Sequence, residues 1–139
     1  MGLSSKRVKG YVIGPGADLS GADLSGADLT EADLARANLR GADLTRADLW
    51  GAKLFGADLT RADLLGAKMS SADLSDAKLV SVFLTNANLT RADLTNANLT
   101  RADLTNANLM GADLTGANLA DTVFNNTRMP DGSIKNPTT

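Results

Sequence analysis

Leucine recurs at every fifth position along most of this chain. From Leu19 to Leu119 the series contains one substitution, Met69, and in the alanine series two positions earlier only Val82 departs. An aspartate or asparagine separates each alanine from its leucine in most units. The chain therefore contains 21 consecutive units of the form Ala-(Asp/Asn)-Leu-x-x, without an insertion or a deletion.

A five-residue period fits neither a helix nor a flat strand. Five residues advance a helix by about 500°, which is about 140° beyond a full turn, so successive leucines would spread around its whole surface. In a strand, side chains alternate with period two, so Leu19 and Leu24 would face opposite sides, as would Ala17 and Ala22. All of these side chains can be buried together only if the chain bends by the same angle every five residues.

A regular bend of this kind winds the chain into a coil. Within one unit the alanine and the leucine are two positions apart and face the same side, whereas the aspartate or asparagine between them faces the other. The alanines and leucines would line the inside and the polar residues the outside. A short, fixed repeat is typical of a solenoid, and this one predicts an all-β solenoid.

The repeat also resembles a known family. Units such as Ala22-Asp23-Leu24-Ser25-Gly26 and Ala87-Asn88-Leu89-Thr90-Arg91 resemble those of pentapeptide repeat proteins, which are numerous in cyanobacteria, and the resemblance covers residues 12–134. It implies a right-handed quadrilateral parallel β-helix with four repeats per coil, here about six coils. Residues twenty apart would then stack in internal ladders, the first made by Leu19, Leu39, Leu59, Leu79, Leu99 and Leu119 and the next beginning at Leu24.

The expected core has leucine at the centre of each face and alanine near each corner. Ala17 and Ala22 begin the alanine rows, where converging walls leave little room for a larger side chain. Met69 and Val82 are the two positions at which local adjustment is expected, at a cost of about 1–3 kcal/mol or less each.

The chain divides into an N-terminal segment or cap at 1–16, a β-helix at 17–129, and a C-terminal turn and tail at 130–139. Tyr11–Ile13, with Val12 on the alanine frame, is expected to fold over the first coil. At the other end Phe124, Met129 and Ile134 occupy leucine positions. Phe124 has two interpretations: a larger plug for the last coil, or a contact in an end-to-end homodimer, as in some proteins of the family that the repeat resembles.

Composition narrows the possible functions. The 139 residues include 14 basic and 16 acidic side chains, for a net charge of −2, which favours neither nucleic-acid nor membrane binding. Histidine and cysteine are absent, which excludes Ser-His-Asp and Cys-His catalysis and imidazole or thiolate zinc sites. We therefore expect no enzyme, cofactor or metal. The chain has no run of 18 apolar residues and no signal-peptide core, so a cytoplasmic location is the default expectation.

The stacked polar positions are expected to be structural. Columns such as Asp23, Asp43, Asp63 and Asp103 could suggest a calcium ladder, but carboxylates spaced along one face do not enclose an ion. Bonding of each Asp or Asn to a nearby backbone amide is the expected role. Lys53, Lys68 and Lys78 each stack next to an aspartate, which would relieve like-charge repulsion. On this hypothesis, Lys53→Asp lowers stability more at low salt than at high salt.

Outward-facing apolar residues are the remaining candidates for function. Trp50 and Phe55 each follow a leucine in consecutive units, and Phe83 replaces an aspartate in an irregular unit. Trp50 and Phe55 are the expected centre of a partner-binding surface, because tryptophan is enriched at interface hot spots. The alternative is that these are isolated apolar residues of an ordinary surface.

The leading hypothesis is thus a non-enzymatic rod that binds a protein partner or acts as a structural scaffold, as a monomer or an end-to-end homodimer. The alternative is inhibition of DNA gyrase or topoisomerase by mimicry of DNA, an activity of long acidic rods in the family that the repeat resembles. A rod of about six coils spaced ~4.8 Å apart is roughly 29 Å long. Duplex DNA of that length carries about 17 negative charges, so a net charge of −2 makes mimicry the weaker hypothesis.

Overall fold

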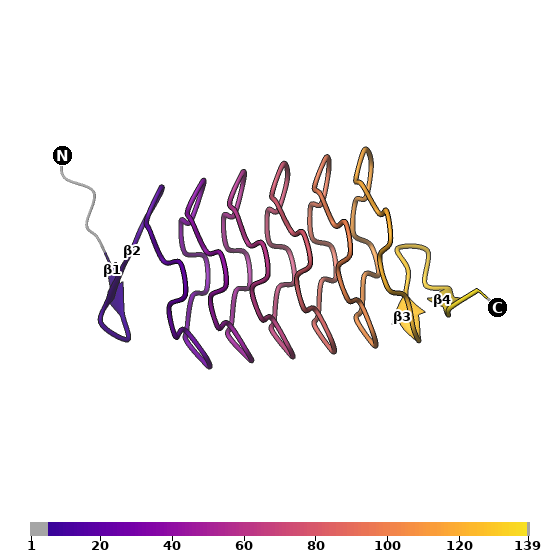
Figure 1. The fold of residues 1–139 in the computed structure, drawn as a ribbon, viewed down its shortest axis with the longest axis horizontal. Helices are drawn as coiled ribbons and strands as arrows, with labels where there is room; N and C mark the ends of the chain where they lie inside the picture. Colours follow the sequence, from indigo (N-terminus) through magenta and orange to yellow (C-terminus); the bar gives the residue numbers. More distant parts are fainter. Residues whose placement is uncertain (1–5, 139) are drawn as a thin grey trace.

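The computed structural model describes residues 6–138, which form a rod of stacked coils with the two chain ends at opposite ends of the rod (Figure 1). Two antiparallel strand pairs flank the coils: β1 (Lys6–Val8) with β2 (Tyr11–Ile13), and β3 (Thr127–Arg128) with β4 (Ile134–Lys135). Between them, parallel bridges join each central residue to the residue twenty positions later, from Asp18↔Asn38 to Asn108↔Arg128. One coil therefore contains four pentapeptides.

Every backbone N–H of a regular pentapeptide has a partner, as the unit from Ala57 to Arg61 illustrates. Its N–H groups donate, in chain order, to Leu54 O, Ala37 O, Lys78 O, Asp58 Oδ1 and Val80 O. The bond to Lys78 O is 2.7 Å long and the other four are 3.0 Å. Three of these five bonds reach a neighbouring coil, one closes the corner, and one uses the side chain of the unit's own aspartate. Since unpaired backbone groups are costly when buried, this arrangement explains why the period does not slip.

The corner itself depends on an unusual backbone conformation that the sequence analysis did not anticipate. The fifth residue of each unit has a positive φ, whether it is a glycine such as Gly56 (φ 65°) or an arginine such as Arg61 (φ 61°). Glycine adopts this left-handed conformation freely, and asparagine and aspartate tolerate it better than other residues. The frequency of Gly and Asn at the fifth position follows from this requirement.

The leucine and alanine rows form the core. The leucine positions from Leu24 to Leu109 are fully buried, including Met69, and Leu19 is 2% exposed. Val82 is also fully buried, and its N–H lies 3.3 Å from Leu79 O, compared with about 3.0 Å at most other corners. The larger valine side chain is thus accommodated by a slightly wider corner.

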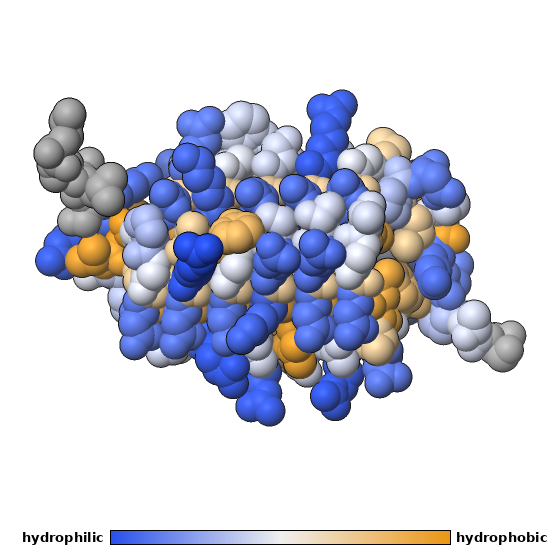
Figure 2. All heavy atoms as spheres, turned by 90° about the horizontal axis from the view of Figure 1, so that it is seen from above, coloured by the Kyte–Doolittle hydropathy of each residue, from blue (hydrophilic) through white to orange (hydrophobic). Residues whose placement is uncertain are grey.

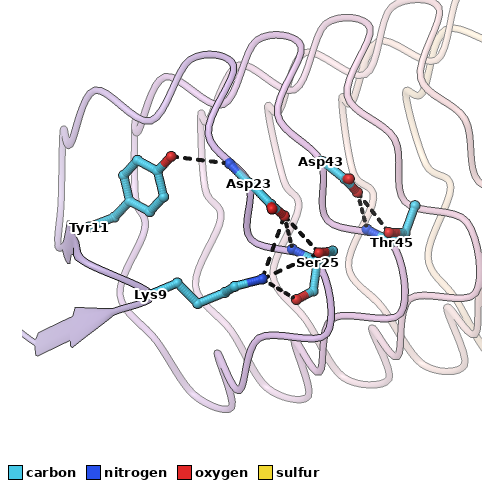
Figure 3. A network of polar contacts seen from close by, with 6 residues as sticks. All are labelled: Lys9, Tyr11, Asp23, Ser25, Asp43 and Thr45. Carbon is cyan, nitrogen blue, oxygen red and sulfur yellow. Dashed lines mark hydrogen bonds and ion pairs between the residues drawn. The ribbon is translucent and has the colours of Figure 1, made fainter.

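The β1–β2 hairpin covers one face of the first coil (Figure 3). The amide of Asp23, which has no preceding coil to bond, donates to the Tyr11 hydroxyl at 3.3 Å. The Lys9 ammonium donates to Ser25 O at 2.9 Å and forms an ion pair with Asp23 at 3.5 Å. Two side chains of the hairpin therefore replace backbone partners that a further coil would supply. Ala17, at the open edge of this coil, is only partly buried.

Val12 does not continue the alanine row, contrary to the expectation from its position in the frame. Its side chain is 44% exposed, whereas its neighbour Ile13 is buried at 4%. The reason is that β2 pairs antiparallel with β1 instead of following the coil, so the side of the chain that faces the core changes.

The C-terminal end is covered less completely. Leu114, Leu119, Phe124 and Met129 are only partly buried, although all four occupy leucine positions. Ile134, which also occupies a leucine position, is 46% exposed, because it lies in β4, which turns back to pair with β3.

Polar residues replace alanine in the last coil without leaving unpaired groups. The hydroxyl of Thr122 donates to Leu99 O at 2.8 Å, and that of Thr127, which is fully buried, donates to Leu104 O at 2.7 Å. The Lys135 ammonium lies 4.5 Å from the centre of the Phe124 ring and covers part of it.

The hairpin contact can be tested at a single amide. Tyr11→Phe removes the only acceptor that the structure gives to the Asp23 amide, so hydrogen exchange at Asp23 should accelerate, with a loss of about 0.5–1.5 kcal/mol of local protection. The matched control is the amide of Asp43, which donates to Ala22 O and should exchange as in the wild type. Unchanged protection at Asp23 would contradict the proposed cap.

Candidate functional site

The outer faces carry a repeated side-chain-to-backbone contact. Every Asp or Asn at the second position of the units from 18 to 118 accepts a hydrogen bond from the amide two residues later. Where that residue is Ser or Thr, its hydroxyl can bond to the same oxygen, as Thr45 does to Asp43 at 2.7 Å (Figure 3). These side chains complete the backbone bonding of the coil and are thus structural.

This kind of contact lowers the pKa of six aspartates. For Asp58, partial burial raises the pKa, but the Thr60 hydroxyl and amide and the Arg40 guanidinium at 3.1 Å outweigh it and lower the pKa below its usual value. Hydrogen bonds from the following Ser or Thr likewise lower the pKa of the other shifted aspartates, Asp18, Asp23, Asp28, Asp113 and Asp131. A general acid requires the opposite shift.

The aspartate columns also provide no metal centre within the described part of the chain. Residues 6–138 contain no group of three or more His, Cys, Asp or Glu side chains arranged to hold an ion. The carboxylates point back to their own corners instead of converging on a shared point.

The stacked lysines lie beside aspartates but do not contact them. Lys53 bridges Asp33 and Asp73 through the backbone, yet none of the three lysines forms an ion pair within 4 Å in the described residues. Asp58, the neighbour of Lys78, pairs with Arg40 instead. The aspartates are turned toward the amide two residues later, which leaves only a longer-range interaction along the column.

The lysines have a second consequence, which sequence reasoning missed. A lysine at the second position cannot accept the amide bond that Asp or Asn accepts. Four units have Lys or Phe at the second position, and within residues 6–138 the amide two positions later has no hydrogen-bond partner in any of them. These amides belong to Phe55, Ser70, Val80 and Thr85, which follow Lys53, Lys68, Lys78 and Phe83 in that order. The signal was available in the sequence, because these units lack Asp and Asn.

The three candidate partner-binding residues do not form one cluster. Trp50 and Phe55 follow successive leucines of the same coil and thus lie at successive corners. Phe83 bridges Asp63 and Asp103, which places it in another column of the rod. The coil geometry therefore places Trp50 and Phe55 at the two ends of one face of the coil and separates Phe83 from them.

The side chains also differ in exposure. Trp50 is 47% exposed and Phe83 51%, whereas Phe55 is partly buried beneath the Arg36 guanidinium, which lies 5.1 Å from its ring centre. On the face in Figure 2, hydrophobic residues lie singly among hydrophilic ones and gather toward the two ends of the rod. We define the Trp50–Phe55 surface as the outer side of residues 50–55.

The family model for pentapeptide repeats matches residues 16–51, 51–86 and 87–126, in eight copies. The chain therefore belongs to the pentapeptide repeat family, whose members are generally non-enzymatic structural or binding proteins. No curated protein matches the sequence. Within residues 6–138 the structure has no helix that is long and apolar enough to cross a membrane.

Solved structures of pentapeptide repeat proteins are similar to this chain. Rfr23 from the cyanobacterium Cyanothece 51142 is 42% identical, with a TM-score of 0.63, over 66% of this chain and 63% of its own. The protein alr5209 from Nostoc Pcc 7120 is 38% identical, with a TM-score of 0.62, over 73% of this chain and 83% of its own. The chain thus spans less than two thirds of Rfr23.

A third structure shares the fold. QnrB1, a plasmid-mediated fluoroquinolone resistance protein, is 24% identical, with a TM-score of 0.67, over 81% of this chain and 60% of its own. These similarities establish a β-helix built from pentapeptide repeats.

The aspartate contact predicts a local dependence on pH. Folding lowers the pKa of Asp58. Its ionised carboxylate therefore stabilises the fold fully at a pH above the usual aspartate pKa of about 3.9, and this stabilisation is lost as the pH falls through the lower pKa of the folded state. The protection factor of the Thr60 amide should be flat from pH 7 to 5 and decrease below about pH 4. The Thr90 amide, bonded to the non-titrating Asn88, should not change. An equal loss at both amides would show that the Asp contact is not the cause.

The lysine columns yield a prediction that separates charge from bonding. Lys53→Asn supplies the missing acceptor for the Phe55 amide without adding negative charge, and should raise the free energy of unfolding by about 0.5–1.5 kcal/mol. Lys53→Asp supplies the same acceptor but creates an unbroken column of five stacked carboxylates, at positions 33, 53, 73, 93 and 113. In denaturant titrations the Asp variant should therefore be less stable than the Asn variant at low salt, and the two should converge at high salt. A constant difference would refute the charge-column hypothesis.

Proposed function

We propose that the chain is a non-enzymatic rod that binds a protein partner through the Trp50–Phe55 surface. We also infer that its coils form the right-handed quadrilateral variant of the β-helix. The observation that carries the binding role is the 47% exposure of Trp50, the only tryptophan in the sequence.

A rod of this construction suits recognition. Its backbone bonds continue from coil to coil, so a partner meets side chains that are already held in place. Preorganisation reduces the entropy lost on binding. Trp and Arg are enriched among residues that dominate binding energies, and Trp50 lies one corner before Phe55, which stacks with Arg36.

The chemistry of the faces favours binding over catalysis. The sequence has no histidine or cysteine, and the shifted aspartates have lowered pKa values, which suit fixed charges and not proton transfer. The DNA-mimic alternative is not favoured. A net charge of −2 is far below that of a duplex, and the resemblance to QnrB1 concerns the fold alone.

We further propose that the C-terminal end forms an end-to-end homodimer. Leu114, Leu119 and Phe124 are partly buried there, whereas the leucines of the first coil are covered. Within residues 6–138 the amides of Leu114 and Leu119 also lack the backbone acceptor that a following coil would supply. Apolar side chains and unpaired strand edges together favour self-association.

The binding surface can be tested by affinity capture with matched variants. Trp50→Ala combined with Phe55→Ala should reduce recovery of a specific partner by at least tenfold. Met110→Ala is the control, because Met110 is 45% exposed and occupies the same corner column as Trp50, three coils further along the rod. Equal recovery by all three proteins would exclude the Trp50–Phe55 surface.

The dimer proposal is tested by sedimentation at micromolar concentration. The wild type should sediment as a dimer, and Leu119→Lys should sediment as a folded monomer because a charge would be buried in the interface. A monomeric wild type would remove the end-to-end dimer and leave Phe124 as a plug for the last coil.

A further inference from the structure

A groove opens at the N-terminal end of the rod, where the chain leaves the twenty-residue pattern. The amide of Gly16 still donates to Ala35 O at 2.8 Å, as the equivalent amides do in later coils. Immediately before it, Pro15 has no N–H to continue the pattern, and the chain turns out into the hairpin. The hollow that remains has a volume of about 510 Å³. We call it the N-terminal groove, lined mainly by residues 12–15 on one side and 30–33 on the other.

One wall of this groove is an unpaired strand edge. One coil later, Lys53 N donates to Ala32 O at 2.9 Å, and Lys53 O accepts from Leu34 N at 2.8 Å. Asp33 occupies the equivalent place in the first coil, but its N–H and C=O have no backbone partner among residues 6–138, nor does the C=O of Thr30. An exposed edge of this kind is a template for an added extended strand.

The groove combines an apolar floor with acidic residues. Ile13 and Ala32 are buried at 4% and 8% and line its base. Glu31 and Asp33 also line it, and neither forms an ion pair with the rest of residues 6–138. Asp33 accepts only the Ala35 amide, since alanine stands where other units have a hydroxyl donor. The groove lining contains two carboxylates and a single ammonium, that of Lys6, so the groove favours a cationic side chain.

The groove adjoins the Trp50–Phe55 surface. Trp50 O accepts a hydrogen bond from Glu31 N at 2.8 Å, and Phe55 O accepts one from Arg36 N at 2.8 Å. The segment from Trp50 to Phe55 is therefore hydrogen-bonded to the segment from Glu31 to Arg36, which includes part of the groove edge. A ligand that pairs with the edge would come within one coil of Trp50.

We propose that the N-terminal groove binds an extended, basic peptide segment of a partner protein by strand addition. The peptide backbone pairs with Thr30 and Asp33. A Lys or Arg side chain meets Glu31 and Asp33, and an alternate β-branched side chain meets Ile13 and Ala32. The inference rests on the proposed function, because it specifies the chemistry of the partner that a binding rod would hold.

The test uses the peptide acetyl-Lys-Val-Lys-Val-Lys-amide and the full chain. Saturable binding is expected, with a change in Trp50 fluorescence and amide NMR shifts confined to residues 30–33 and their neighbours. The same peptide with alternate N-methylated amides cannot pair with an edge and should bind at least tenfold more weakly. The acidic analogue, with Glu in place of Lys, should not bind.

Two double variants test the site. Glu31→Gln with Asp33→Asn keeps the corner bond to Ala35 and should weaken binding at least fivefold at low salt. The matched control, Asp93→Asn with Asp113→Asn, removes two charges from the same column at the other end of the rod and should leave binding unchanged.

Any one of four results would overturn the proposal. Equal weakening by both double variants would indicate general attraction to the acidic columns, and full binding of the N-methylated peptide would exclude strand addition. If a variant lacking residues 2–5 bound the peptide much more tightly, the chain's own N-terminal residues would be competing with the peptide, and the groove would be assigned to them. If a partner captured through Trp50 is unaffected by Glu31→Gln with Asp33→Asn, this inference fails while the proposed function stands.

Discussion

The hydrogen bonds between successive coils are the interaction on which the rest of this structure depends. Burial of one coil's four leucines stabilises it by less than the backbone entropy lost when twenty residues are ordered. A single coil is therefore unstable, and the bonds to its neighbours must supply the difference. Because they align residues that are twenty positions apart, these bonds fix the stacking of the leucine and alanine rows as well as the backbone.

The same bonding pattern explains the polar half of the repeat. Three N–H groups of each unit bond to adjacent coils and one closes the corner, which leaves one amide for the aspartate or asparagine side chain. The outer faces are thus occupied by groups already engaged in holding the coil. The candidates for binding are therefore the residues that depart from the repeat, such as Trp50, and the two ends of the rod, where the repeat stops.

The two ends of the rod are covered by different segments of the chain. At the start, Tyr11 and Lys9 reach back to the Asp23–Ser25 edge, and Pro15 turns the chain away before the Thr30–Asp33 edge is paired. At the finish, the hairpin of β3 and β4 leaves Leu114 and Leu119 partly uncovered. Each end therefore combines a closed part with an open one, and both binding proposals outside the Trp50–Phe55 surface concern the open parts.

The repeat alone was sufficient to predict a β solenoid with buried leucine and alanine rows, because a strict period leaves few alternatives. It could not predict the left-handed corner at residues such as Arg61, since arginine has no preference for that conformation and only the bend requires it. The five-residue frame also does not describe Val12 and Ile134, which are exposed because pairing within a hairpin replaces pairing between coils. The separation of Phe83 from Trp50 depends on the number of units per coil, which the family resemblance implied and the spacing did not fix.

The most direct test of this account is NMR detection of scalar couplings across hydrogen bonds. A coupling between the nitrogen of Leu59 and the carbonyl carbon of Lys78, nineteen residues later, is expected, with equivalent couplings along each leucine row. Couplings from Leu59 to a carbonyl four residues earlier, or to one fourteen or twenty-four residues later, would contradict the four-unit coil and everything inferred from it.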